Sequence, residues 1–329
     1  CGCGKNNAAQ HYESGWAAME KKDYTTAINE FQQVIDQNSR LAESYRAEGI
    51  AYYSEKAYPE AIAAFSRSLN NMDDPDKEFK KDVQFYLAQA RMDYGEVDKA
   101  IEVYSEILKA GEDEQAFFLR GKAYISMEDY KNAEKDFQRA LEGCEDYNLY
   151  INIYQIYVDH NKAVDGDAYL KMALELEPQD GEDCYHRGRI YEYEKNYEAA
   201  RDELKTAMEQ GYEDAMLLLG RVYLEMEDPA SARSMYQEYL QKSEQGAKAY
   251  NGLAMCDIYD GAYDSPLENI AQGLKENSKE DEQGLLYNEI VAYEYKRDFA
   301  TAKEKMKIYL EQYPEDEAAL RENEFLSTR

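Results

Sequence analysis

Basic residues, proline, tryptophan and long apolar runs are all scarce in this sequence. Its 329 residues include 38 Lys and Arg against 68 Asp and Glu, with Pro 6 and Trp 1. Because phosphate contacts need clustered Lys and Arg, the formal net charge of −30 argues against nucleic-acid binding. No run of about 18 apolar residues occurs, so the sequence predicts no membrane-spanning helix.

Motifs that carry catalysis or metal binding are missing as well. The three histidines, His11, His160 and His186, have no second ligand at helical spacing. Phosphate-loop, dinucleotide-binding and nucleophile-elbow motifs do not occur, and the acidic clusters lack calcium-loop spacing. The sequence therefore predicts a protein that is not an enzyme, with no cofactor and no metal site.

What the sequence does contain is an internal repeat with a period near 34 residues. A small residue is often followed three positions later by Tyr, then by an aromatic, an Ala and a second aromatic or Leu. The clearest copies begin at Gly15, Gly49, Gly121, Gly188 and Gly220. The anchor alanines are Ala27, Ala61, Ala100, Ala133, Ala200, Ala232 and Ala302.

Each copy has the apolar spacing of two helices. In the second copy, Tyr45, Gly49 and Tyr52 share one face of a first helix, and Ala61 and Phe65 mark a second helix. A short polar turn, residues 54–57, separates them. The small residues allow the two helices to approach closely, and the aromatic after the Ala is expected to fill the space between neighbouring copies.

This pattern resembles the tetratricopeptide repeat (TPR), a 34-residue helix–turn–helix unit. The match is strong in copies 1, 2, 4, 6 and 7 and weaker in the others; the third copy has Ala88 at the Gly position. The resemblance implies an all-α superhelical solenoid of about nine TPR units over residues 8–316. Residues 317–329 are expected to form a C-terminal capping helix and tail, since the end repeat needs a polar outer face. The longer turn at 71–77 is either a plain loop or a bend.

The N-terminal residues, CGCGKNN, resemble the start of a mature bacterial lipoprotein, in which the first Cys carries the lipid. This predicts lipidation at Cys1, a short tether over residues 1–7, and a location in the bacterial cell envelope, lipid-anchored and facing outside the cytoplasm. Cys144 and Cys184 could form a disulfide only if their Cα atoms came within about 7 Å. The sequence favours free thiols.

The family resemblance also implies where a partner would bind. In TPR units, positions 2, 5, 6, 9, 12 and 13 of each first helix face the concave groove. Position 9 is occupied by Trp16, Ile50, Gln89, Lys122, Gln155, Arg189, Arg221, Met255 and Val291. Asn148, Asn152 and His186 lie on the same expected face. This strip either recognises an anionic group, or its cations pair with Glu192, Glu225 and Asp159.

Tyrosine is abundant, with 32 residues, and 19 of them occupy packing positions of the repeat. Eight of the others fall on the expected groove face, where they either contact a ligand or pack between first helices. These are Tyr12, Tyr53, Tyr86, Tyr185, Tyr193, Tyr259, Tyr287 and Tyr295.

The sequence thus predicts a membrane-anchored extracytoplasmic adaptor that binds a peptide or protein in its groove. The alternative is a glycan-binding lipoprotein whose tyrosines stack on sugar rings. The candidate groove residues are Lys122, Asn152, Gln155, Tyr185, His186, Arg189, Arg221 and Tyr259.

Overall fold

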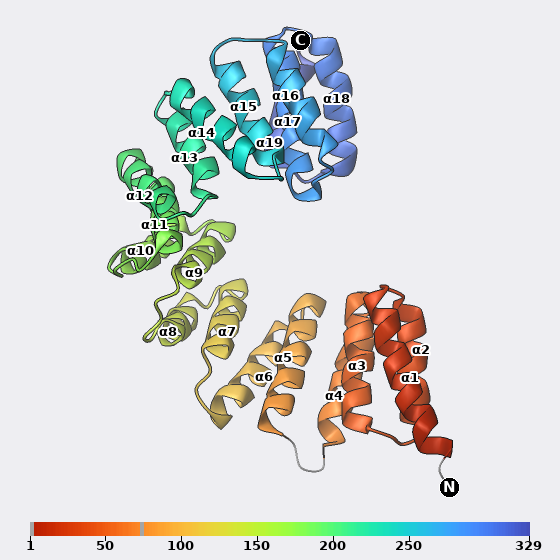
Figure 1. The fold of residues 1–329 in the computed structure, drawn as a ribbon. Helices are drawn as coiled ribbons and strands as arrows, with labels where there is room; N and C mark the ends of the chain where they lie inside the picture. Colours follow the sequence, from red (N-terminus) through yellow and green to blue (C-terminus); the bar gives the residue numbers. More distant parts are fainter. Residues whose placement is uncertain (1–2, 73–75) are drawn as a thin grey trace. The chain divides into compact units, whose positions relative to one another are not determined.

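The computed structural model describes residues 3–72 and 76–329, with side chains from Asn7 onward, and every regular element in these ranges is an α-helix (Figure 1). The nineteen helices confirm the all-α prediction. They fall into two compact units, Cys1–Tyr169 and Leu170–Arg329, each with its own buried clusters.

The first unit contains nine complete helices and the start of a tenth. They are α1 (Cys3–Glu20), α2 (Tyr24–Asp36), α3 (Leu41–Ser54), α4 (Tyr58–Asn70), α5 (Lys77–Tyr94), α6 (Val97–Ala110), α7 (Glu114–Ser126), α8 (Tyr130–Ala140), α9 (Tyr147–Asp159) and α10 (Ala163–Leu174). The second unit continues with α11 (Gly181–Tyr193), α12 (Tyr197–Glu209), α13 (Ala215–Glu225), α14 (Pro229–Lys242), α15 (Ala247–Tyr259), α16 (Ser265–Lys275), α17 (Lys279–Tyr295), α18 (Phe299–Gln312) and α19 (Glu317–Ser327).

The turn inside each helix pair has the same geometry. The first helix ends in a residue with positive φ, and the amide after it donates to a carbonyl five residues back, as Asp23 N does to Ala18 O at 2.9 Å. This is the Schellman motif, which satisfies carbonyls left open at a helix end. Among the described residues, two such turns lie between pairs, at Asn38 and Gly211, and nine lie inside pairs: Lys22, Lys56, Gly95, Glu128, Asn161, Lys195, Glu227, Gly261 and Arg297. The array therefore has nine helix pairs, including those whose sequence match is weak.

In the pairs that have a glycine at the small-residue position of the first helix, close packing depends on that glycine. A Cβ atom on Gly121 would lie 2.6 Å from the Phe137 ring, and one on Gly220 would lie 2.6 Å from Tyr236. The same aromatic ring also reaches the next pair, since a Cβ on Gly252 would lie 2.3 Å from Tyr236. The aromatic residue fills the space between neighbouring pairs, as the repeat pattern predicts.

Helix α19 covers the open end of the last pair. Its Ala319 and Leu326 are buried in one cluster with Met306 and Tyr309 of α18. Asp316 fixes the start of α19, because its carboxylate accepts hydrogen bonds from Ala318 N at 3.0 Å and Ala319 N at 3.1 Å.

Two expectations concern segments at the margin of the described chain. Residues 3–7 of the expected tether are helical, because α1 begins at Cys3 and no proline interrupts this stretch. Cys1 lies outside the described residues. So do residues 73–75 in the turn between α4 and α5, where the expected loop or bend falls.

Within the described ranges, none of the helices is long and apolar enough to cross a bilayer.

Candidate functional site: a groove in the C-terminal unit

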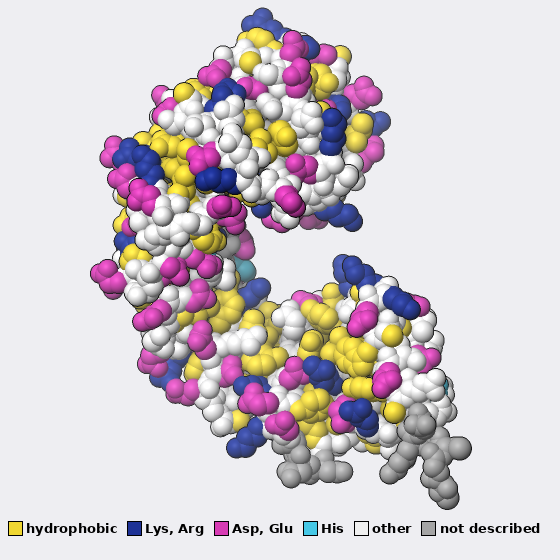
Figure 2. Space-filling view, viewed as in Figure 1, with side chains coloured by type: hydrophobic (Ala, Val, Ile, Leu, Met, Phe, Trp, Pro, Cys, Tyr) yellow, Lys and Arg dark blue, Asp and Glu magenta, His cyan; other side chains and the backbone are white. Residues whose placement is uncertain are grey.

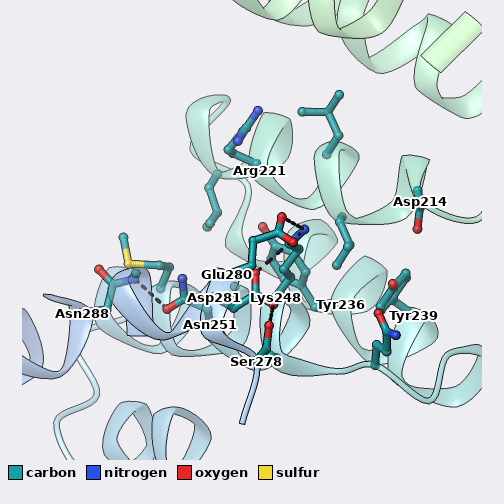
Figure 3. Close-up of a pocket in the computed structure, with 18 of the residues that line it drawn as sticks. Asp214, Arg221, Tyr236, Tyr239, Lys248, Asn251, Ser278, Glu280, Asp281 and Asn288 are labelled. Atoms are coloured by element: carbon teal, nitrogen blue, oxygen red, sulfur yellow. Dashed lines mark hydrogen bonds and ion pairs between the residues drawn. The ribbon is translucent and has the colours of Figure 1, made fainter. Parts of the chain in front are cut away.

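The C-terminal unit contains a groove of about 1000 Å³. Its walls come from the first helices of successive pairs, mainly α13, α15 and α17 (Figure 3). Tyr185 of α11 also lines it. In the space-filling view, apolar side chains are exposed on this unit among charged ones (Figure 2).

The groove lies on the face that the repeat register predicts. When Arg221 is placed at position 9, all six expected positions of α13 line the groove: Asp214, Leu217, Leu218, Arg221, Leu224 and Glu225. Four positions of α15 do the same: Lys248, Asn251, Gly252 and Met255. On α17, Gly284 and Asn288 follow the same register.

The floor of the groove is apolar and rigidly packed. Tyr236 of α14 is only 4% exposed and lies between Gly220 and Gly252, where neither glycine leaves room for a methyl group. Its burial raises the pKa of the Tyr236 hydroxyl. Leu217 and Leu224 of α13, half-buried, pack against the same cluster.

Above this floor, two asparagines from neighbouring helices meet. Asn288 Nδ2 of α17 donates to Asn251 Oδ1 of α15 at 2.7 Å (Figure 3). Among the described residues, neither Asn251 Nδ2 nor Asn288 Oδ1 has a hydrogen-bond partner. The pair therefore offers one donor and one acceptor, which is the complement of a peptide group.

The cations of the groove are already neutralised by the protein. The Arg221 guanidinium contacts Glu192 of α11 at 2.5 Å and 2.7 Å. Lys248 Nζ lies 3.1 Å from Glu280 and 3.9 Å from Asp281. Of the two interpretations of the cation strip, internal pairing thus holds at Arg221, and the partner is Glu192.

The other candidates on α11 form a cluster of their own. His186 is 6% exposed, and its Nδ1 lies 3.3 Å from an Arg189 guanidinium nitrogen. The Tyr185 ring lies 5.9 Å from the Arg189 guanidinium and 5.0 Å from the Tyr212 ring. Of these three candidates, Tyr185 lines the groove and His186 and Arg189 do not.

Three candidates belong to the N-terminal unit. Gln155 donates to Asp159 at 2.9 Å, so it also bonds to an acid of its own helix. Lys122 and Asn152 are exposed, on α7 and α9 respectively. None of the three lines the groove of the C-terminal unit.

The tyrosines of the expected groove face divide into two groups. Tyr12, Tyr53, Tyr86, Tyr185 and Tyr287 are half-buried and pack against other rings; Tyr86, for example, stacks on Phe65 at 5.5 Å. Tyr193, Tyr259 and Tyr295 are 37%, 50% and 54% exposed. Packing between helices thus accounts for five of the eight, and Tyr259 lies outside the groove lining.

The cysteines with described side chains are free. Cys184 and Cys256 are buried, and Cys144 is half-buried. Burial raises the pKa of the Cys256 thiol to about 11, so this thiol is protonated at neutral pH and unreactive. The sequence prediction of free thiols is confirmed for these three residues.

Several groove residues were absent from the sequence-based candidates. Asn251, Asn288 and Lys248 line the groove, but they are neither at position 9 nor among the groove-face tyrosines, and the other polar candidates came from the central repeats. The same register would have found them, because they occupy positions 5, 6 and 2 of their helices. The polar residues at all six groove positions of every repeat are the sequence feature that points to them.

Comparisons with known proteins identify the same repeat unit that the helix pairs show. One family model described as "Tetratricopeptide repeat" matches residues 12–76, 185–247 and 217–257, and a second model with the same description matches residues 114–146. Together these matches cover slightly more than half of the chain. No curated protein matches the sequence.

Solved structures give similar helix arrays at low identity. A tetratricopeptide repeat protein from Parabacteroides merdae is 15% identical, covering 86% of this chain and 99% of its own, with a TM-score of 0.47. YrrB, described as a TPR protein with an unusual peptide-binding site, is 26% identical over 57% of this chain and 97% of its own, with a TM-score of 0.37. PilF from Pseudomonas aeruginosa is 17% identical over 66% of this chain and 97% of its own, with a TM-score of 0.43.

The matched segments carry the glycine, tyrosine and alanine signature of the strong copies. The nine Schellman turns extend the same unit to copies that the family models leave unmatched. The chain therefore belongs to the tetratricopeptide repeat family.

Proposed function

We propose that this protein is an adaptor that binds an extended peptide segment of a partner protein in the groove of its C-terminal unit. Proteins with this fold typically act as scaffolds for protein interactions. The observation that carries the proposal is the Asn251–Asn288 pair above the apolar floor. The amides satisfy the backbone of an extended segment, while Leu217, Leu224 and Met255 receive its apolar side chains.

The experiment begins with a display library of random 12-residue peptides panned on the full chain. Peptides that bind are then titrated against the double variant Asn251→Ala, Asn288→Ala. Loss of two hydrogen bonds of about 0.5–1.5 kcal/mol each should weaken binding by roughly 10-fold or more. The variant should keep its helical circular dichroism, because both side chains are half-buried and face the groove.

The matched control is Asn29→Ala, an exposed asparagine on α2 in the N-terminal unit, which should leave affinity unchanged. The proposal fails if the library yields no binding peptide, or if the selected peptides bind the double variant and the wild type equally.

We further propose, from the sequence, that the adaptor is held in a bacterial envelope by a lipid on Cys1. The support is the resemblance of CGCGKNN to a mature lipoprotein start, and Cys1 itself lies outside the described residues. Intact mass spectrometry of the protein isolated from its own cells should show two or three acyl chains on the N-terminal peptide, and Cys1→Ser should release the protein from membranes. An unmodified N-terminal peptide would refute this part of the proposal.

A further inference from the structure

The charges around the groove indicate what kind of segment it takes. Five carboxylates line it, at Asp214, Glu225, Glu276, Glu280 and Asp281, against two cations, Arg221 and Lys248. Both cations are already in contact with carboxylates. A negatively charged segment would thus find its partners occupied and excess acid around it.

The carboxylates differ in how many hydrogen bonds and ion pairs they make within the protein. Glu276 accepts hydrogen bonds from Gly246 N at 2.7 Å and Ala247 N at 2.9 Å, so it caps α15. Asp281 accepts from the Ser278 hydroxyl at 2.7 Å. These two groups are part of the structure of the unit.

Asp214 and Glu225 can still accept hydrogen bonds or form ion pairs with a bound segment. Asp214 precedes α13 but makes no side-chain capping bond, and it has no ion pair among the described residues. Glu225, at the other end of α13, accepts one long hydrogen bond from the Tyr197 hydroxyl at 3.3 Å. Both are exposed and line the groove, at opposite ends of one helix (Figure 3 labels Asp214).

We infer that the segment bound in this groove is cationic, with Lys or Arg side chains paired to Asp214 and Glu225 and with apolar side chains between them on the floor. This inference rests on the proposed function. Charge complementarity selects the occupant, because the net charge of the lining is negative and its cations are engaged. The net charge of −30 also attracts a cationic segment over longer distances.

The same peptide panning tests the inference with two further measurements. Selected peptides should be enriched in Lys and Arg relative to the unselected library, and their affinity should fall as salt is raised from 50 to 300 mM. The variant Asp214→Asn, Glu225→Gln keeps the shape of both side chains and should weaken a Lys- or Arg-containing peptide by about 10-fold. The peptide with those residues changed to Gln should bind the variant and the wild type equally.

The control Asp98→Asn, Glu102→Gln makes the same change in net charge at exposed positions of α6 and should have no effect. Selection of acidic peptides, or unchanged affinity in the Asp214/Glu225 variant, would overturn the inference while leaving the groove proposal intact, provided that the Asn251/Asn288 variant still loses binding. If the Asn251/Asn288 variant keeps full affinity, the proposed function itself fails.

Discussion

Replacing Phe137 by alanine is expected to lower the free energy of unfolding of the N-terminal unit by about 3–5 kcal/mol. The ring is fully buried, and its centroid lies 6.2 Å from that of Phe118, 6.1 Å from Tyr157 and 5.9 Å from Tyr169. It also covers Gly121, which has no side chain to occupy the space left by the missing ring. The cavity therefore opens at the junction of α7, α8, α9 and α10.

Native-state hydrogen exchange measures this effect locally, and amides of α7 and α8 should lose the most protection. In a repeat array each unit contacts its neighbours alone, so α17 and α18 should exchange as in the wild type. The control is Phe325→Ala on α19. Because the Phe325 side chain is 40% exposed, its removal should lower the free energy of unfolding by well under half as much. A loss below about 1 kcal/mol at Phe137 would contradict its role at this junction.

Replacing Glu48 by glutamine is expected to stabilise the protein at pH 8 by about 2–3 kcal/mol and to change little at pH 4. Glu48 is 3% exposed, immediately before Gly49 of α3. Arg120 and Arg187 occupy this register in other pairs and bond to Asp136 and Glu203 at 2.7 Å and 2.8 Å. In the second pair the facing residue is Ala64, and Glu48 has no hydrogen bond or ion pair among the described residues.

The pH dependence follows from the buried carboxyl. Burial raises the pKa of Glu48 to about 7 from its ordinary value of 4.5, and the charge of Arg67 offsets part of that rise. The folded state binds the proton more tightly than the unfolded state does, so its stability falls as pH rises from about 4.5 to about 7. Above that range the full cost of the buried charge remains.

Urea unfolding of wild type and variant at pH 4, 6 and 8 measures this difference. Glu60→Gln, an exposed glutamate on α4, is the control and should show no pH-dependent gain. If the two proteins differ equally at all three pH values, Glu48 does not titrate in this range.

The repeat pattern predicted the fold because each of its residues acts within one helix pair or between neighbours. Gly121 and Phe137 are 16 residues apart, and their contact follows from helix geometry alone. The same register correctly predicted the face of α13 that lines the groove. Even the weak third copy, with Ala88 in place of glycine, keeps its left-handed turn residue at Gly95.

Side-chain partners were harder to predict, because they depend on which rotamers meet across helix pairs. The sequence left two interpretations of Arg221 open, and the contact with Glu192, 29 residues away, decided between them. The register alone also could not show whether Tyr86 faces a ligand or stacks on Phe65. The groove residues Asn251 and Asn288 gain their significance from facing each other, which is a property of the packed helices.

Photo-crosslinking of a panned peptide to the full chain measures most directly whether peptides bind in the groove. A photoreactive phenylalanine analogue replaces Met255 in the groove, and in a second protein it replaces Met127, a 44% exposed residue directly after α7. Peptide adducts are expected from position 255 and not from position 127, and the adduct should be lost when Asn251 and Asn288 are both alanine. Equal adducts from both positions, or adducts from position 127 alone, would show that peptides do not bind in this groove.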